Sequence, residues 1–401
     1  MTTVVLVAPG EDAAMMASDL ELEGVDVRHV AADDLSGAAL AGADALLLTP
    51  TRATLTADLV GACDRAGVRI LPIGPEDSRL AARFGLPAPL PYDTPAWRIV
   101  QALASAPPAV DGAPTRPSRV IAVWGPHGAP GRSTIAVQLA VELSRAGRRT
   151  GLVDADSVAP SLALQLGLGD EAPGLAAACR RAELGSLDVA ELSRLSTPVE
   201  TSGGTVEVLG GLNRPSRWPE LGAARVRSTL AICRSWLDET VVDVAAEFDE
   251  DDDPLDPGGP ARHAATSAAL LEADAVVAVL SADPLGVSRF LRGHSELRHL
   301  IGGTPVTVVA NRVRPGPLGI DARGQIRRTL DRFAGIDEVA FVPDDQRAVD
   351  AAALHARAIA DVAPRSALVS AVRRVAAGLG ARPEVIAGSS RGSSRAARRL
   401  R

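Results

Sequence analysis

Short apolar runs alternate with segments of helical spacing along residues 1–100. Four runs are rich in β-branched residues or leucine and predict strands: Val4–Val7, Val25–Val30, Ala45–Leu48 and Val68–Ile73. Segments with the apolar spacing of helices begin at Glu11, Leu55 and Glu76. Strands that alternate with helices predict a small α/β domain with a parallel sheet.

A proline-rich stretch interrupts this alternation. Residues 104–118 contain four prolines and no periodic pattern, which predicts a semi-rigid linker over residues 101–118. Residues 381–401 are small, polar and basic, and they predict a disordered tail rich in Arg and Ser. The chain therefore divides into an N-terminal domain (1–100), the linker, a larger domain (119–380) and the tail.

The larger domain repeats the alternation of strands and helices. Val120–Val123 predicts a strand, residues 125–131 a glycine-rich turn, and Ser133–Ala146 a helix with apolar residues on one side. Later runs that predict strands are Thr150–Asp156, Thr240–Asp243, Val306–Asn311 and Glu338–Val342. This order predicts a three-layer α/β domain with a mainly parallel sheet.

The composition argues against several classes of protein. A hydrophobic fraction of 46% with 2% aromatic residues is typical of helices and parallel strands packed by Ala, Val and Leu. A net charge of −7 argues against a surface covered by nucleic acid. The three cysteines form no CxxC pair, so we expect neither a disulfide framework nor a zinc site. With no predicted leader or spanning helix, the sequence indicates a cytoplasmic protein.

The glycine-rich turn carries the candidate chemistry. A strand, a turn of this kind and a helix start present backbone N–H groups and a helix N-terminus to a phosphate. The strict phosphate-loop pattern has a glycine at the first position and a lysine before the Ser or Thr. Here Pro126 replaces that glycine and Arg132 replaces the lysine; all 42 residues in the combined lysine and arginine count are arginine.

The order of parts after the turn resembles the ParA/MinD family of phosphate-loop ATPases, over about residues 119–380. The family's loop has the sequence Lys-Gly-Gly-x-Gly-Lys-Thr, and an Asp-x-Asp pair, a further strand-ending aspartate and an adenine-contacting asparagine follow it. The matching residues are Asp154, Asp156, Asp243 and Asn311. The resemblance implies a nucleotide-dependent homodimer that uses ATP or ADP and Mg²⁺.

The resemblance also implies a role for each matching residue. Those that would contact the phosphates are His127, Gly128, Gly131, Arg132, Ser133 and Thr134. Those that would hold Mg²⁺ are Ser133 and Asp243. Those that would serve hydrolysis are Asp156, which would position the attacking water, Asp154 and Arg132. Those that would surround the adenine are Asn311, Arg312, Pro343 and Asp344. The alternative for the aspartates is an ordinary turn at a strand end.

Departures from the family pattern fall on catalysis. His127 occupies the position of the family's signature lysine, which contacts the phosphates of the partner subunit, and an unperturbed imidazole is mostly neutral at pH 7. Arg132 keeps the charge of the loop lysine on a planar fork of different reach. Pro130 lacks an N–H group, so the loop loses one donor. We therefore expect weakened nucleotide binding and slow or absent hydrolysis.

The N-terminal domain resembles a response-regulator receiver domain, a flavodoxin-like fold, in its size and order of elements. A receiver needs an aspartate at the end of its third strand and a lysine, but here the strand ends in Leu48-Thr49-Pro50 and no lysine exists. Glu11 and Asp12 could mimic the acidic pair that binds magnesium, although acidic residues favour helix N-termini in any case. We expect a phosphorylation-independent module that docks a protein partner.

Two charged segments have open interpretations. Seven of the ten residues from Glu247 to Asp256 are acidic, and they predict either a solvated loop or a contact with a basic partner such as the chain's own tail. The arginines of the tail could contact anionic lipid or DNA, although the tail lacks the apolar face of an amphipathic membrane helix. A solvated segment is the simpler interpretation of both.

A ParA/MinD-like domain behind a receiver-like domain resembles the CpaE/TadZ type of proteins, in an actinobacterial variant. This resemblance implies a cytoplasmic factor, at times peripheral at the inner face of the membrane, that positions or assembles pilus or secretion machinery. One alternative is an active ParA- or MinD-type ATPase in chromosome partitioning or division-site selection. The other is a scaffold that keeps the fold and binds no nucleotide.

Overall fold

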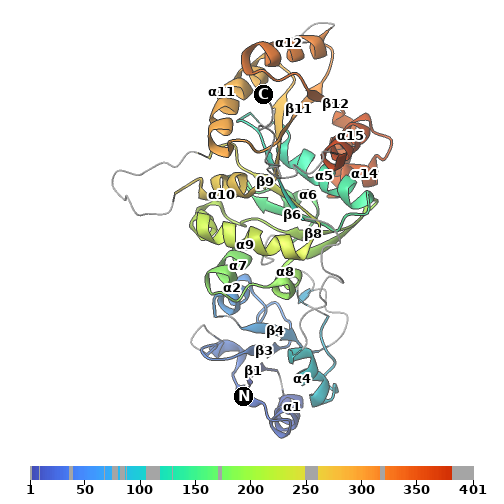
Figure 1. Cartoon of the computed structure of the whole chain (residues 1–401). Helices are drawn as coiled ribbons and strands as arrows, with labels where there is room; N and C mark the ends of the chain where they lie inside the picture. The colour runs from blue at the N-terminus through green and yellow to red at the C-terminus, as the bar shows by residue number, and fades with distance from the viewer. Residues whose placement is uncertain are drawn as a thin grey trace, which may run out of the picture.

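The computed structural model describes residues 2–8, 10–35, 39–66, 68–74, 80–81, 86, 88–104, 118–128, 130–169, 174–248, 261–316 and 321–381. Its described strands form two sheets, one from the N-terminal region and one from the region after the linker. Figure 1 shows the smaller sheet at one end of the chain and the larger sheet beyond it. The predicted tail beyond residue 381, residues 105–117 of the linker and residues 249–260 of the acidic segment lie outside the described residues.

The N-terminal sheet has four parallel strands in the order β2-β1-β3-β4. Its strands are β1 (Thr3–Val7), β2 (Asp26–His29), β3 (Ala45–Leu48) and β4 (Arg69–Pro72). Its helical segments are α1 (Gly10–Leu22), η1 (Ala32–Asp34), α2 (Ala57–Ala66) and α4 (Ala96–Ala104). Two apolar clusters cover the opposite faces of this sheet, which explains why its strands are continuous apolar runs. The predicted small parallel sheet is confirmed, and its order matches the first four strands of flavodoxin-like folds.

The larger sheet has eight strands in the order β12-β11-β10-β5-β9-β6-β8-β7. The strands are β5 (Arg119–Trp124), β6 (Thr150–Ala155), β7 (Thr197–Thr201), β8 (Gly204–Leu209), β9 (Glu239–Val244), β10 (Ala275–Ser281), β11 (Val306–Val313) and β12 (Val339–Pro343). All pairs are parallel except the β7–β8 hairpin. The predicted mainly parallel sheet is therefore confirmed.

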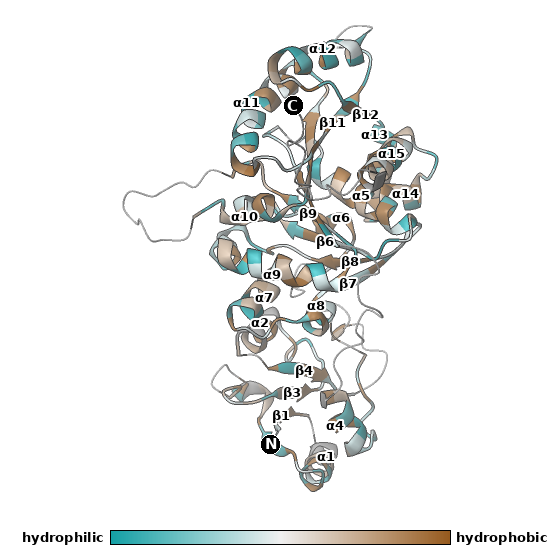
Figure 2. Cartoon of the chain, viewed as in Figure 1, coloured by the Kyte–Doolittle hydropathy of each residue, from teal (hydrophilic) through white to brown (hydrophobic). Residues whose placement is uncertain are grey.

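Helices cover both faces of the larger sheet and complete three layers (Figure 1). One face packs against α7 (Leu175–Glu183), α8 (Val189–Leu195), η2 (Pro215–Leu221), α9 (Ala223–Trp236), α10 (Ala264–Glu272), α11 (Pro284–Ile301) and α12 (Ala322–Ala334). The other face packs against α5 (Arg132–Arg145), α6 (Leu162–Gln165), α13 (Gln346–His355), α14 (Ile359–Val362) and α15 (Ala367–Ala381). In Figure 2 much of β11 is brown, as expected for a strand covered on both faces.

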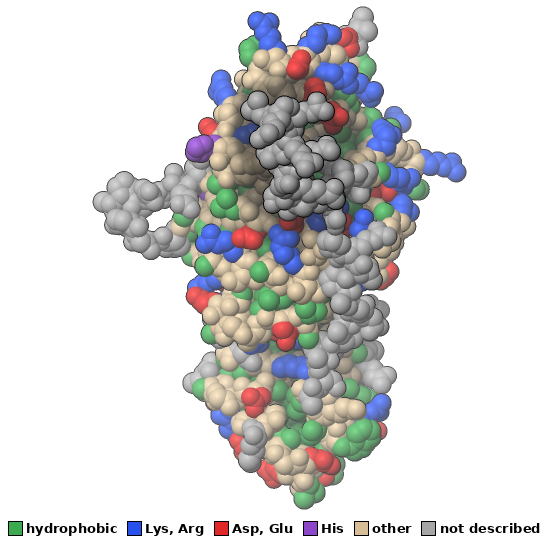
Figure 3. All heavy atoms as spheres, viewed as in Figure 1, with side chains coloured by type: hydrophobic (Ala, Val, Ile, Leu, Met, Phe, Trp, Pro, Cys, Tyr) green, Lys and Arg blue, Asp and Glu red, His purple; other side chains and the backbone are tan. Residues whose placement is uncertain are grey.

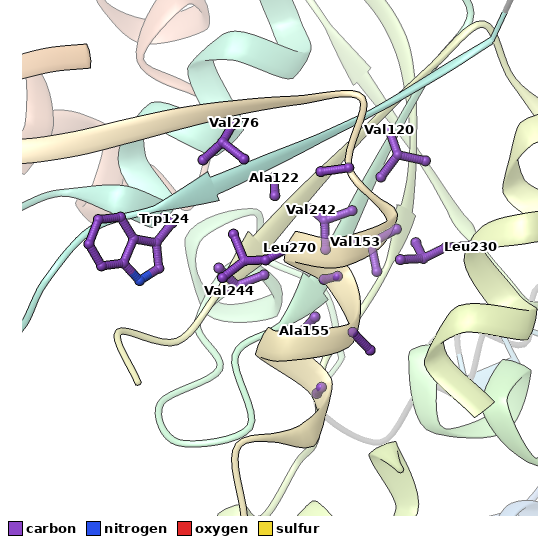
Figure 4. Packing of buried hydrophobic residues seen from close by; sticks show 14 of the residues in the cluster. Val120, Ala122, Trp124, Val153, Ala155, Leu230, Val242, Val244, Leu270 and Val276 are labelled. Atoms are coloured by element: carbon purple, nitrogen blue, oxygen red, sulfur yellow. The ribbon is translucent and has the colours of Figure 1, made fainter. Parts of the chain in front are cut away.

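The core beside the central strands contains small aliphatic side chains and one large aromatic. Figure 4 shows Val120 and Ala122 of β5 with Val242 of β9, covered by Leu270 of α10. Trp124 at the end of β5 is 1% exposed, and its Nε1 donates a hydrogen bond to the Ala246 carbonyl over 2.8 Å. The end of β5 is thereby fixed to the segment that follows β9.

Three strands of the larger sheet had no counterpart in the sequence analysis. The strand β10 lies between β5 and β11, and it was missed although its first six residues are all apolar. The β7–β8 hairpin extends the far edge of the sheet through a turn at Ser202 and Gly203.

Figure 3 shows basic and acidic side chains interspersed over the visible face of both regions. Within the described ranges, no helix combines the length and the apolar character needed to cross a bilayer.

Helix α2 packs against α7, so the N-terminal region contacts the larger domain on the side of the hairpin strands (Figure 1).

Candidate functional site

The glycine-rich loop connects β5 to α5 at the edge where the central strands end. Gly131 caps α5 with a φ of 93°, which is in the left-handed region that glycine adopts without strain. The first turn of α5 begins at Arg132, so its backbone N–H groups have no partners within the helix. Ser133 lies in this turn, and Thr134 lines a cavity of about 120 Å³ that it shares with α13. The loop therefore has the local geometry of an anion site.

Arg132 folds back over the loop. Its Nη1 donates to the carbonyl oxygens of Gly125 at 2.9 Å and Pro126 at 3.4 Å. Its Nη2 is 3.3 Å from Oδ2 of Asp156. Its Nε is buried and has no hydrogen-bond partner among the described residues. The guanidinium is thus held at the start of the loop and paired with one of the predicted catalytic carboxylates.

Asp154 and Asp156 end β6 and shape the segment after it. Asp154 is 1% exposed, and its carboxylate accepts hydrogen bonds from the backbone N–H groups of Ser161 at 2.9 Å and Leu162 at 3.0 Å. Asp156 accepts backbone hydrogen bonds from residues 158 and 159. Burial, to which the nearby charge of Asp156 adds, raises the pKa of Asp154 to about 7 against the effect of the backbone donors. Both carboxylates fix this segment beside the loop.

The carboxylate of Asp243 is buried at the end of β9. The residue is fully buried, and neither of its carboxylate oxygens has a hydrogen-bond partner among the described residues. Burial raises the pKa of Asp243 well above the usual range, and the charge of the neighbouring Asp154 adds to this rise. The side-chain hydroxyl of Ser133 and the positive charge of Arg132 partly offset it. A buried carboxylate without partners costs free energy that a bound cation would recover.

The residues around Asp243 fit a magnesium ion that is bound together with phosphate. Within the described residues, no group of three His, Cys, Asp or Glu side chains could hold a metal ion by itself. Mg²⁺ commonly uses one or two protein oxygens and completes its shell with water and substrate phosphates. Ser133 and Asp243, the two predicted magnesium ligands, would supply a hydroxyl and a carboxylate at the loop, and the phosphates would supply the rest.

The side chain of Asn311 is hydrogen-bonded to the loop. Its Nδ2 donates to the Pro130 carbonyl over 2.8 Å, and the side chain is 4% exposed. A Cβ on Gly131 would lie well inside 3.0 Å of the same amide, so only glycine fits there. Asn311 is predicted to lie beside adenine; in this structure its Nδ2 contacts the loop, and its Oδ1 has no partner among the described residues.

A second opening lies next to the loop, where β10, β11 and β12 end. This cavity has a volume of about 230 Å³, and its lining residues are Ser281, Ala282, Asp283, Arg312, Arg314, Asp344 and Gln346. Arg312 has a φ of 59°, at an irregularity in the β11–β12 pairing, and its side chain is exposed. Pro343 is the last residue of β12. The cavity brings together Arg312 and Asp344, two of the four residues predicted to surround the adenine, with three residues from β10 and its end for which the sequence carried no motif.

His127 is paired within its own chain. Its Nε2 lies 2.6 Å from Oε1 of Glu247, and Nε2 of the buried His263 lies 2.9 Å from the other oxygen of the same carboxylate. The His127 and Glu247 side chains are 65% and 50% exposed, so the first pair is open to solvent. A histidine at the signature position thus connects the loop to the segment after β9. Sequence reasoning missed His263, because it has no motif around it.

The matching edge of the N-terminal sheet has a different character. Thr49, which follows β3, shares a hydrogen bond of 2.8 Å with the hydroxyl of Tyr92. Thr54 donates to the Thr49 carbonyl over 2.7 Å. The side chains of Glu11 and Asp12, the predicted acidic pair, lie outside the described residues. A pair of hydroxyl side chains therefore lies where β3 ends.

Comparisons with known proteins agree with this geometry. The ParA family model, described as a NUBPL iron-transfer P-loop NTPase, matches residues 116–196. A ParA family ATPase from Chlorobium tepidum is similar with a TM-score of 0.54 and 19% identity over 65% of this chain and 98% of that chain. The septum site-determining protein MinD of Pyrococcus horikoshii, complexed with Mg-ADP, has a TM-score of 0.52 and 16% identity over 65% and 96%. The cell division ATPase MinD of Pyrococcus furiosus has a TM-score of 0.51 and 18% identity over 66% and 98%.

No curated protein matches the chain. At these identities the likeness to solved structures concerns the fold. The larger domain has the ParA/MinD-type P-loop NTPase fold, and its loop segment matches the ParA family model. The site residues therefore have to be judged by their own geometry.

Proposed function

We propose that this chain is a cytoplasmic ParA/MinD-like switch that binds ATP or ADP with Mg²⁺ and hydrolyses ATP slowly or not at all. The proposal rests on the carboxylate of Asp243, which is buried beside Ser133 and the loop and has no hydrogen-bond partner among the described residues. A bound Mg²⁺ with phosphate would supply the missing partner. The Mg-ADP complex of the similar MinD protein supports this choice of ligand.

The arrangement of the cations supports slow hydrolysis. Arg132 is held by two loop carbonyls and by Asp156, so it would have to leave those partners to reach a phosphate. His127 is engaged by Glu247 of the same chain, although the resemblance assigns this position to a contact across a dimer. Electrostatic catalysis depends on groups already aimed at the developing charge. Both candidate groups have other partners in this structure.

The wider role extends the proposal to partners. A nucleotide-dependent homodimer would form through the loop edge, and the N-terminal domain would dock a protein of pilus or secretion machinery. The support is the presence of a separate parallel-sheet domain whose strand edge carries Thr49 and Tyr92 in place of phosphoacceptor chemistry. An N-terminal domain of this kind would act through its surface.

Calorimetric titration with Mg-ATP and Mg-ADP tests the binding step. We expect both nucleotides to bind, and we expect phosphate release to stay slow with anionic vesicles or duplex DNA present. Lack of binding at millimolar nucleotide would favour the nucleotide-free scaffold. Turnover that vesicles or DNA clearly stimulate would favour the active partitioning or division-site ATPase.

Arg132→Lys probes the loop directly. A lysine lacks the fork that holds Arg132 to the carbonyl oxygens and to Asp156, so we expect changed nucleotide affinity and faster turnover. Arg145→Lys, at the other end of α5, is the matched control and should change neither. Unchanged affinity and turnover in Arg132→Lys would show that Arg132 does not contact phosphate.

A further inference from the structure

One arginine lies against the loop without belonging to it. Arg289 is in the second turn of α11, and a Cβ placed on Gly128 would lie well inside 3.0 Å of its Nη1. Gly128 has a φ of 107°, where other residues are strained. Glycine is therefore required at this position both by the backbone and by the guanidinium beside it.

The packing of α11 fixes the place of this guanidinium. Phe290, the next residue, is fully buried, and its ring centroid lies 6.4 Å from that of Trp124. Gly293, one turn later, is so close to Trp124 that a Cβ there would lie 3.0 Å from the indole. The loop begins directly after Trp124, so α11 and the loop share one rigid contact. Arg289 is thus presented to the loop by the core.

Arg289 is also available for a ligand. Its side chain is exposed, and within the described residues its guanidinium forms no hydrogen bond or ion pair. Partial burial tends to raise the pKa of Asp283, but hydrogen bonds from the Ser281 hydroxyl and from backbone N–H groups lower it below its usual value. The charge of Arg289 adds to this lowering. By contrast, Arg132 is bound to loop carbonyls, and His127 is bound to Glu247.

The position of Arg289 indicates which part of a nucleotide it would contact. In phosphate loops the side chain at the Arg132 position extends to the β- and γ-phosphates. Here the Arg132 guanidinium is instead held by the carbonyls of Gly125 and Pro126 at the start of the loop, so the terminal-phosphate end of the site lacks the cation that the loop normally supplies. Gly128 and the Arg289 guanidinium beside it lie along this same part of the loop.

We propose that Arg289 contacts the terminal phosphate of bound ATP and supplies, from α11 of the same chain, the fixed positive charge that His127 lacks. This inference rests on the proposed nucleotide binding and names the residue that would distinguish ATP from ADP. Arginine suits this role because its planar fork can donate two hydrogen bonds to phosphate oxygens and stays charged at all relevant pH values.

Calorimetric titration of the full chain with Mg-ATP and Mg-ADP provides the test. Loss of a hydrogen bond to a charged group corresponds to about a 10- to 100-fold change in affinity, so Arg289→Ala should weaken Mg-ATP by that factor and Mg-ADP much less. Arg289→Lys should restore part of the ATP affinity. Arg292→Ala, an exposed arginine on the same helix, is the matched control and should change neither affinity.

The outcomes separate this proposal from the one it rests on. If the wild-type chain binds Mg-ATP and Arg289→Ala binds it equally well, Arg289 is not a phosphate contact and the proposed function stands. Equal weakening of ATP and ADP would place the contact away from the terminal phosphate and overturn the inference. If the wild-type chain binds neither nucleotide, both proposals fail together. Should Arg289→Ala fold poorly, Arg289→Gln removes the same charge with nearly the same side-chain length.

Discussion

The two parallel sheets of this chain differ most where their strands end. At that edge of the N-terminal sheet, the Thr49 and Tyr92 hydroxyls satisfy each other, and Thr54 satisfies the Thr49 carbonyl. At the corresponding edge of the larger sheet, the Asp243 carboxylate and Oδ1 of the Asn311 side chain are buried without a partner among the described residues. Ligands of open α/β sheets bind at this edge. The polar groups at this edge are therefore hydrogen-bonded to one another in the N-terminal domain, which we call the closed edge. In the larger domain some of them have no partner among the described residues, and we call this the open edge.

This difference indicates how a binding edge is recognised without its ligand. Native proteins satisfy nearly all buried polar atoms, so a cluster of unsatisfied ones points to a missing partner. Within the described residues of the N-terminal domain, Arg28 Nε is the one buried side-chain atom of this kind. The larger domain has several close to its loop. Substitutions at the two edges should therefore have different consequences for stability and for nucleotide binding.

Gly131→Ala and Gly42→Ala compare the two domains at left-handed glycines. Both have positive φ, 93° and 71°, but a Cβ at Gly131 would overlap the Asn311 amide, whereas none of the described atoms lies within 4 Å of one at Gly42. We expect Gly42→Ala to cost about 1–2 kcal/mol of unfolding free energy from strain. Gly131→Ala should cost about 2–5 kcal/mol, because overpacking adds to the strain.

Urea unfolding of both variants measures this difference. Gly131→Ala should also abolish the nucleotide binding seen by calorimetry, since the alanine displaces the amide that holds the Pro130 carbonyl. Gly42→Ala should bind nucleotide as the wild type does. Equal costs for the two substitutions would mean that Asn311 moves aside easily and does not hold the loop.

Asp243→Asn changes the open edge with little change in shape. If the aspartate holds Mg²⁺ through water, its loss should weaken Mg²⁺-dependent nucleotide binding by about 10- to 100-fold, as for other residues that support a metal through a second shell. Nucleotide titrations with and without Mg²⁺ measure the effect, which should disappear when the metal is absent. Equal weakening under both conditions would contradict a metal-supporting role and indicate general damage to the loop.

The sequence predicted the fold better than it predicted the contacts within the site. The strands predicted to end at Asp156, Asp243 and Asn311 are present, with ends one or two residues away, because apolar runs followed by polar residues mark the ends of buried parallel strands. The strand β10 was missed, and with it α11 and Arg289, which no motif identifies. Contacts such as that between His127 and Glu247 join residues 120 positions apart, so no local pattern could reveal them.

The pH dependence of stability offers a test of the same carboxylate without nucleotide. The pKa of Asp243 is raised in the folded state mainly by burial, so the folded protein binds more protons than the unfolded one above about pH 4. Folding stability of the wild type should therefore fall as pH rises above this value, by up to about 1.4 kcal/mol per pH unit. Asp243→Asn should lack this part of the slope.

Urea unfolding at several pH values from about 5 to 7 compares the two proteins. The stability advantage of the asparagine variant should grow with pH across this window. Asp154, whose pKa burial raises to about 7, contributes the same trend, and its charge also raises the pKa of Asp243, so the difference between the two proteins reports both carboxylates together. A difference that stays constant with pH would show that Asp243 titrates normally and is not isolated from solvent.

The smallest effect is expected at the closed edge. Thr49→Val removes one partner of the Tyr92 hydroxyl and should lower the stability of the N-terminal domain by about 0.5–1.5 kcal/mol, with nucleotide affinity unchanged. Hydrogen exchange of the β3 amides measures this local stability. Tyr92→Phe should cost a similar amount, and the double variant less than the sum, because removing both partners leaves no unsatisfied hydroxyl. If the two costs simply add, the hydroxyls of Thr49 and Tyr92 are solvated independently. The polar groups of the N-terminal edge would then not satisfy each other, which contradicts the comparison.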